Sequence, residues 1–238
     1  MRVTFVFHSC FVVELERTVI IFDYYGEGTL PKLPKDKKIY FLASHGHRDH
    51  FDKKIFKCRK ELPLAEYILS WDIRLTPDEE RPWIHKVKRD EGLVMGPVAI
   101  RTLKSTDKGV AFQVKAEEVS IYHAGDLNWW HWEGEDKGWN NNMAANYKRE
   151  IHKIEGQHFD LAFVVLDPRL GGAYDWGMNY FLEHTDNDHV FPMHCWQDYQ
   201  VCSRFLEARA ETYGPDGLDI FHSPEYPGQV WEFAPGES

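Results

Sequence analysis

The residues between 44 and 52 read SHGHRDHFD and supply three imidazoles and two carboxylates within nine positions. They directly follow the apolar run IYFLA, so they lie in a loop between an expected strand and an expected helix. On an irregular turn, side chains two, four and five residues apart can converge on one or two ions. Imidazole together with carboxylate suits zinc, iron or manganese. The spacing therefore predicts a metal site made by His45, His47, Asp49 and His50.

The elements around this cluster predict two packed sheets flanked by helices. Strand patterns dominate the first 125 residues, and helical spacing appears after the cluster and again in the second half. No Gly-rich dinucleotide or Walker signature favours a doubly wound single sheet. Strands are expected at 2–8, 11–15, 18–22, 38–44, 98–103, 109–116, 118–124 and 160–167, and helical spacing begins at Phe51, Met143 and Val201.

Length, charge and composition narrow the class of protein. A chain of 238 residues without a linker or repeat predicts one domain over 1–238. A formal net charge of −10 disfavours binding to phosphate backbones, so no nucleic-acid partner is expected. No apolar run approaches membrane-spanning length, the N-terminus alternates like a strand, and the four cysteines form no CxxC pair. We expect a cytoplasmic protein with reduced thiols, no membrane contact and a small molecule as its partner.

The run HGHRDH matches the HxHxDH signature of the metallo-β-lactamase superfamily, which the chain resembles over most of its length. The resemblance implies an α/β fold of four layers, αββα, with two mixed sheets flanked by helices. It also implies that Asp126, in VSIYHAGDLN, bridges two metals, and that His194, after HVFPM, is a ligand of the second metal. Asp23, at the end of TVIIFD, resembles the family aspartate that orients a ligand histidine through its other nitrogen.

Three positions are similar to particular branches of the superfamily. His50, where true β-lactamases have cysteine or arginine, resembles the general hydrolase branch. His47 stands where oxygen-reducing di-iron members have glutamate, which disfavours redox chemistry. The segment FHSCFVVE resembles the lactonase-like branch that includes ascorbate-6-phosphate lactonase, in which a histidine at the position of His8 lies near the site.

One ligand of the family pattern is missing between the cluster and Asp126. The chain has LKSTDKGVAF where a histidine of the first metal is expected. Asp107 could replace that imidazole on a hard metal, or the Ser-Thr-Asp run could merely cap a turn. His123, three residues before Asp126, could instead lean towards the metals. His85 lies too early in the chain and is interpreted as structural.

The segment GDLNWWHWEGEDKGWNNN is unusually rich in tryptophan for a polar loop. Its indoles could wall a pocket over the metals and stack on a planar or sugar-like substrate, or they could pack the loop onto the core. We expect at least one indole among Trp129, Trp130 and Trp132 to face a pocket, with His131 as a hydrogen-bond partner.

The end of strand 160–167 carries a further polar pair. If the topology is right, it lies at the same sheet edge as the other motifs. Arg169 could clamp a carboxylate or phosphate through its planar fork, or it could form a structural ion pair with Asp167.

These features predict a hydrolase that uses a metal-bound hydroxide, because coordination lowers the pKa of water from about 15.7 to about 7. The expected substrate is a small-molecule ester, lactone or phosphoester, and the cofactor is one or two divalent ions, zinc first, with manganese or iron as alternatives. The rival interpretations are a nuclease-type phosphodiesterase and a degenerate metal-binding protein without catalysis. The expected ligands are His45 and His47 for the first metal, Asp49, His50 and His194 for the second, Asp126 between them and Asp107 as the candidate replacement, with Asp49 or His131 moving the proton.

Overall fold

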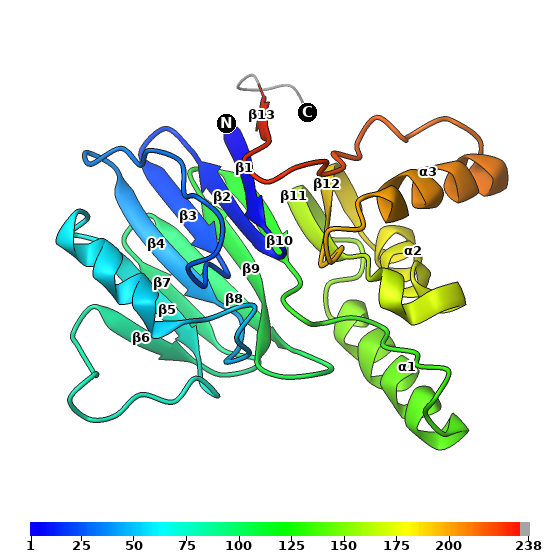
Figure 1. The fold of residues 1–238 in the computed structure, drawn as a ribbon, viewed down its shortest axis with the longest axis horizontal. Coiled ribbons are helices and arrows are strands. Elements are labelled where there is room, and N and C mark those ends of the chain that lie inside the picture. The colour runs from blue at the N-terminus through cyan, green and yellow to red at the C-terminus, as the bar shows by residue number, and fades with distance from the viewer. Residues whose placement is uncertain (234–238) are drawn as a thin grey trace.

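Two β-sheets face each other, and helices cover their outer faces (Figure 1). The computed structural model describes residues 1–233. The 3-10 helix η1 lies against the outer face of the first sheet, and helices α1, α2 and α3 lie on the outer side of the second. The four-layer αββα architecture expected from the sequence is confirmed.

The first sheet contains seven strands in the order β13-β1-β2-β3-β4-β5-β6. Its first part is an antiparallel meander, and its second part, from β3 to β6, is parallel. The carboxyl ends of β3 and β4 therefore meet at one edge. The strands are β1 (Arg2–Phe7), β2 (Cys10–Glu14), β3 (Thr18–Phe22), β4 (Lys38–Ala43), β5 (Glu66–Ser70), β6 (Ile84–Val87) and β13 (Val230–Glu232).

The second sheet has six strands in the order β12-β11-β10-β9-β8-β7. Strands β7 to β10 pair antiparallel, while β10, β11 and β12 run parallel. Its strands are β7 (Gly92–Met95), β8 (Val98–Lys104), β9 (Val110–Ala116), β10 (Val119–His123), β11 (His158–Val165) and β12 (Asp186–Met193). The helices are η1 (Lys53–Lys60), α1 (Lys137–His152), η2 (Pro168–Ala173), α2 (Trp176–His184) and α3 (Gln200–Tyr213).

Alternate residues of the central strands enter two different cores. On β2, Phe11 and Val13 face the core between the sheets, while Cys10 and Val12 face the core under η1. Successive strand side chains point to opposite faces, so a strand buried on both faces needs an unbroken apolar sequence. Each fully buried Val or Phe contributes about 1.5–3 kcal/mol through its removal from water. The sheets therefore form a rigid support for the loops at their edges.

Several sequence expectations need correction. The helix expected after Phe51 is only the 3-10 helix η1, because lysines and an arginine dominate Lys53–Lys60 and only Ile55 is buried. Helix α1 begins at Lys137 rather than near Met143, because Asp136 caps it by accepting a hydrogen bond from the Trp139 amide. Strands β5, β7 and β13 and helix α2 were not expected at all, whereas β6 (Ile84–Val87) agrees with the surface strand that the segment RPWIHKV predicts.

Among residues 1–233, no helix combines the length and the apolar character that crossing a membrane requires.

Candidate metal centre

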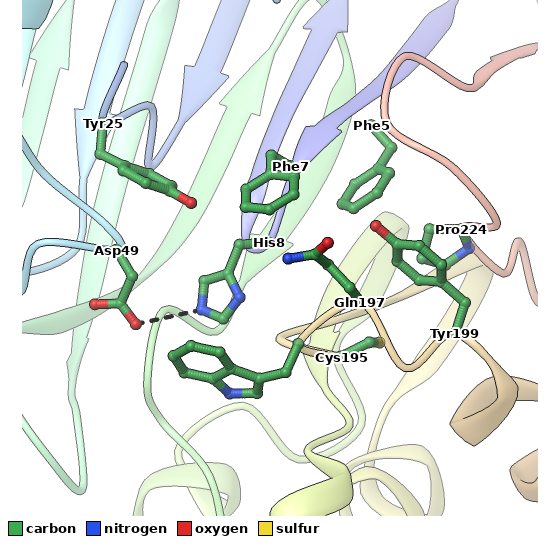
Figure 2. Close-up of a pocket in the computed structure, with 10 residues that line it drawn as sticks. Phe5, Phe7, His8, Tyr25, Asp49, Cys195, Gln197, Tyr199 and Pro224 are labelled. Carbon is green, nitrogen blue, oxygen red and sulfur yellow. Dashed lines mark ion pairs between the residues drawn. The ribbon is translucent and has the colours of Figure 1, made fainter. Parts of the chain in front are cut away.

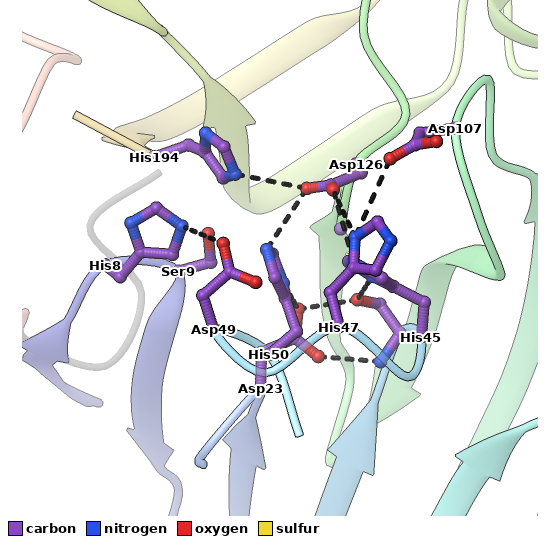
Figure 3. A network of polar contacts seen from close by, with 12 residues as sticks. His8, Ser9, Asp23, His45, His47, Asp49, His50, Asp107, Asp126 and His194 are labelled. Carbon is purple, nitrogen blue, oxygen red and sulfur yellow. Dashed lines mark hydrogen bonds and ion pairs between the residues drawn. The ribbon is translucent and has the colours of Figure 1, made fainter. Parts of the chain in front are cut away.

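The predicted ligands come together at one edge of the two sheets (Figure 3). The loop after β4 carries His45 to His50, and the loop after β10 carries Asp126. His194 directly follows the last residue of β12. Four strand ends, from both sheets and including β3 with Asp23, therefore supply a single cluster of side chains.

Asp126 lies at the centre, and its two carboxylate oxygens face different histidines. Oδ2 lies 3.2 Å from His45 Nε2 and 3.9 Å from His47 Nδ1. Oδ1 lies 3.2 Å from His50 Nε2 and 3.4 Å from His194 Nε2. Figure 3 shows the carboxylate between these two groups. The arrangement is that of a carboxylate placed to bridge two cations.

Several buried polar atoms in this cluster have no hydrogen-bond partner among the described residues. They are the Nε2 atoms of His8, His50 and His194 and Oδ1 of Asp126. Buried polar groups without partners are rare because each costs about 1–3 kcal/mol. Imidazole nitrogens and a carboxylate oxygen around a common space are also the donors that zinc, iron and manganese accept. The residues therefore fit a bound divalent metal.

Other side chains fix the orientation of the candidate ligand histidines through their second nitrogens. Asp23 Oδ2 lies 2.7 Å from His50 Nδ1, and Asp167 Oδ2 lies 2.9 Å from His194 Nδ1. The Ser44 hydroxyl lies 3.0 Å from His45 Nδ1 and donates to Asp23 Oδ2 at 2.7 Å. Such partners fix the ring and leave the other nitrogen free for a metal. The orienting role expected for Asp23 therefore has a geometric basis, whereas the same contact from Asp167 was not predicted.

Two glycines allow the loops to approach this closely. A Cβ atom on Gly109 would lie 2.0 Å from the Ser44 carbonyl oxygen, and one on Gly125 would lie 2.6 Å from Ser44 Cβ. Both glycines have positive φ, of 71° and 52°. No other residue type could place the starts of these segments against the strand end that carries His45.

Electrostatic coupling keeps the central carboxylate ionised. Burial alone would raise the pKa of Asp126, but the charges of His50 and His194 outweigh burial and hold the pKa well below its ordinary value. Burial would also raise the pKa of Asp49, yet the contact with His8 and the charge of His50 lower it. Both carboxylates are thus in the form that binds a cation.

The sequence predicted that His8 lies near the site. In the structure it lies directly beside the candidate ligands. Its Nε2 is 3.4 Å from Asp49 Oδ2, and the two residues form a group of possible ligands with His50 and His194. Burial lowers the pKa of His8 to about 4, so the ring is neutral near pH 7. A neutral imidazole is the form that binds a metal.

Asp107 occupies the place of the missing histidine only in part. Its Oδ2 lies 3.7 Å from His47 Nδ1, and Asp107, His47 and Asp126 form a further group of possible ligands. The Asp107 amide donates to the Ser105 hydroxyl at 3.2 Å, so Ser105 supports the turn while the Asp107 carboxylate faces the cluster. The Thr106 hydroxyl joins this turn to the loop of Asp126 through a 2.6 Å bond to the Asn128 carbonyl.

His123 does not point at the cluster. Its Nε2 lies 2.9 Å from the Ser9 carbonyl oxygen, and its Nδ1 accepts a hydrogen bond from the Gly125 amide at 3.2 Å. The ring also stacks on Phe22 at 4.6 Å. With both nitrogens engaged, His123 supports the loop of Asp126 and is not placed as a ligand. His85 contacts Glu66 on β5, in agreement with its structural interpretation.

A cavity of about 340 Å³ opens over the cluster and is walled largely by aromatic side chains. Trp130 and Trp132 line it as expected, but Trp129 and His131 instead pack against Trp176 of α2. His131 is therefore not placed to move a proton at the metals. Trp196 also lines the cavity, although the sequence did not predict it there. It reaches this position through a turn in which its φ is 51°.

Arg169 forms the ion pair with Asp167 that was one of its two expected roles. The Arg169 Nε lies 3.0 Å from Asp167 Oδ1, and Nη2 lies 2.5 Å from Oδ2. The guanidinium carbon is 4.3 Å from the Trp196 ring centroid and 5.6 Å from that of Trp132. Asp167 thus connects a cleft-lining cation to His194, a candidate ligand.

A smaller cavity of about 80 Å³ lies behind His8 and Asp49 (Figure 2). Trp196 separates it from the larger cleft, because this residue and Asp49 line both. Its remaining walls are mainly aromatic and come from Phe5, Phe7, Tyr25 and Tyr199.

Solved structures with the same fold include a metallo hydrolase from the hyperthermophilic archaeon Ignicoccus hospitalis. It aligns with a TM-score of 0.64 and 16% identity over 98% of this chain and 99% of that protein. A diiron β-hydroxylase from Streptomyces venezuelae aligns with a TM-score of 0.61 and 11% identity, over 98% of this chain and 54% of that protein. At these identities the likeness shows the fold alone.

The sequence itself gives the family. A metal-dependent hydrolase of Methanoculleus marisnigri is 25% identical over 134 residues, which are 53% of this chain and 58% of that relative. This chain therefore matches less than two thirds of the relative's length. The model of the β-lactamase superfamily domain matches residues 2–132, more than half of the chain and the part that contains both the histidine cluster and Asp126. The chain belongs to the metallo-β-lactamase superfamily.

Proposed function

We propose that the protein is a metal-dependent hydrolase acting on a small-molecule ester, lactone or phosphoester. The observation that carries the proposal is the position of Asp126, whose two oxygens face two separate groups of histidine nitrogens. A divalent metal held there would supply Lewis acidity and lower the pKa of a coordinated water. Both effects favour hydrolysis at neutral pH.

The chain offers two positions for one or two such ions. His45 and His47, which both face Asp126 Oδ2, would hold the first with that carboxylate, and Asp107 beside His47 is the candidate further ligand. Asp49, His50, His194 and Asp126 would hold the second, and His8 lies close enough to join them. The mixture of imidazole and carboxylate favours zinc, with manganese or iron as alternatives.

Asp49 is the residue we assign to proton movement. Its carboxylate borders both the open cleft and the small cavity, and its lowered pKa keeps it ionised. Oδ2 is within 3.4 Å of His8 Nε2, so a proton accepted by Asp49 would remain next to a neutral imidazole. A positioned acid or base of this kind typically contributes 10²–10⁴-fold to a rate.

The cleft also suits a small substrate. The indoles of Trp130, Trp132 and Trp196 cover the ligands and would exclude water from one side of a bound molecule. A lactonase-like substrate is our preferred choice within the proposed class. The reason is the β1–β2 turn, in which the segment FHSCFVVE places His8 beside Asp49.

Turnover of model substrates by the zinc-loaded protein tests the proposal. We expect hydrolysis of p-nitrophenyl butyrate and of an aliphatic lactone, with loss of activity on chelation and recovery on zinc addition. Bis-p-nitrophenyl phosphate as the best substrate would favour the phosphodiesterase alternative. Stoichiometric zinc binding without turnover of any of the three would instead favour a metal-binding protein without catalysis.

A further inference from the structure

A cavity of about 540 Å³ lies on the first-metal side of the cluster, away from the tryptophan wall. It is contiguous with the metal centre through two residues. Gly46, between the ligands His45 and His47, forms part of its lining, and Asp107 lines both this cavity and the cleft over the metals. A molecule whose reactive group lies in the cleft could therefore extend into this second space.

The cavity concentrates positive charge. Its lining includes four cationic side chains and only two carboxylates, on Asp72 and Asp107. The whole chain has a net charge of −10, so the local excess of cations is contrary to the overall composition. The four cations are Arg74, Arg89, Lys104 and Lys108.

None of these four cations forms an ion pair within residues 1–233. By contrast, Arg169, which lines the cleft over the metals, is paired with Asp167. Each of the two nearby carboxylates has a partner for one oxygen, while Asp72 Oδ1 is buried without a hydrogen-bond partner among the described residues. Asp72 Oδ2 accepts a hydrogen bond from the Gly46 amide at 2.9 Å, and Asp107 faces His47. The cations are therefore available to an anionic ligand, for which arginine offers a planar fork and lysine a point charge.

An aromatic side chain completes the wall. Trp71 follows β5, and 55% of it is exposed although it is one of the largest apolar residues. Exposed indoles beside cations are suited to binding a flat apolar group that carries a charge.

We propose that this cavity is an anion-binding subsite, which selects substrates that carry a phosphate or carboxylate group on a flat apolar portion. The inference rests on the proposed hydrolase function for its catalytic consequence, but not for binding. Arg74 and Arg89 provide most of the selection, with Trp71 contacting the apolar portion. The basic cavity thus defines the charge of the substrate, and the metal cleft defines the bond that breaks.

Binding of 1-naphthalenesulfonate to the zinc-loaded protein, measured by calorimetry, tests the subsite without any reaction. The sulfonate should bind more tightly than the neutral 1-naphthalenemethanol, and added salt should weaken its binding. The double variant Arg74→Gln/Arg89→Gln should weaken sulfonate binding about tenfold, as expected for the loss of two partly exposed charge contacts. Lys60→Gln, which removes an exposed cation outside this cavity, is the control. Equal affinities for the two probes, or no effect of the double variant, would overturn the proposal.

A matched pair of esters provides the catalytic test. Mono-p-nitrophenyl succinate and p-nitrophenyl acetate share a leaving group, but only the first carries a carboxylate. We expect the ratio of their kcat/KM values to fall about tenfold in the double variant, through KM of the succinate, and to stay within twofold in Lys60→Gln. An unchanged ratio would contradict the subsite while leaving the hydrolase intact. Absence of turnover with both esters, together with selective sulfonate binding, would instead count against the proposed function.

Discussion

The two halves of the candidate metal centre are built differently, although they share Asp126. In the second half, the side chains of His50 and His194 are 0% and 3% exposed, and a buried carboxylate contacts the other nitrogen of each. In the first half, His45 is equally buried, but the side chains of His47 and Asp107 are 34% and 44% exposed. Among residues 1–233, no carboxylate contacts the other ring nitrogen of His47 as Asp23 and Asp167 do for His50 and His194.

This difference shows which candidate ligands are already held in position before a metal binds. Outer carboxylates fix the tautomer and orientation of a ligand histidine, and their loss typically costs 10–100-fold in metal affinity. The second half already has these contacts, whereas His47 and Asp107 would have to be ordered by the ion itself. We therefore expect the second position to bind its metal more tightly than the first.

Replacement of the shared carboxylate should have the largest effect, because it removes a ligand from both halves at once. Asp126→Ala should lower kcat by on the order of 10³-fold, equivalent to a loss of several kcal/mol of charge stabilisation. The fold should survive because the sheets carry the core. Activity assays with circular dichroism would test this, with the exposed Asp216→Ala as control. Preserved turnover in a metal-replete variant would refute the bridging role.

Removal of one orienting carboxylate should weaken only the second half. Asp167→Asn takes the charge away from His194 Nδ1, and we expect the affinity of the second metal to fall by about 10–100-fold. Competition with a chromophoric chelator measures this. Asp167 also pairs with Arg169, so Arg169→Gln is the matched control that breaks the ion pair without touching His194. Equal losses in both variants would assign the effect to the ion pair.

The first half is tested at Asp107. If Asp107 is a ligand, Asp107→Ala should lower the affinity of the first metal and spare the second, and an oxygen should lie about 2.0–2.2 Å from a bound zinc. Asp107→His should be tolerated and could strengthen binding. If the turn alone matters, metal content should stay constant while stability falls by ~1 kcal/mol. Metal titration and thermal unfolding of both variants separate the two cases.

The smallest effect should come from His222. It lies outside both halves of the candidate metal centre, so it measures how much acid lowers the stability of the fold independently of the metal residues. Burial, with a contribution from the charge of neighbouring His189, lowers its pKa to about 4. A lowered histidine pKa stabilises the fold above the unfolded value near 6.5, and this contribution is lost as the pH falls towards 4. Between pH 6.5 and 4, His222→Gln should therefore lose about 1 kcal/mol less free energy of unfolding than the wild type. This magnitude is reduced from the full pKa difference because the ring is partly exposed. Urea unfolding at several pH values measures it.

Much of the fold could be predicted from local sequence, and the exceptions have physical causes. The strands around the histidine cluster are nearly continuous apolar runs, so their expected bounds differ from the observed ones by only one or two residues. Helix α2 was missed because it begins with Trp176 and Gly177 and has no side-chain cap. Gly177 is required by a contact distant in sequence, since a Cβ there would lie 1.9 Å from the Asn128 side chain.

The candidate site likewise has one part that local sequence predicts and another that depends on contacts distant in sequence. The candidate ligands form short motifs, so their types and order could be predicted from the sequence. The outer contact of Asp167 depends on the parallel pairing of β11 and β12, which aligns Val165 with Met193 and brings Asp167 beside His194. A prediction of that strand pairing from the sequence would have revealed the contact between Asp167 and His194. Trp196 reaches the cleft only because of a positive-φ turn, which no pattern of residue types indicates.

The most direct test of the difference between the two halves is the order in which they fill. Crystals of the protein loaded with half an equivalent of zinc would be measured at the zinc absorption edge, and the same titration followed by calorimetry. We expect the first anomalous peak beside Asp126 Oδ1, between His50 and His194, with a second peak near His45 and His47 only at higher zinc. A full peak at His45 and His47 beside an empty position at His50 and His194 would contradict the account.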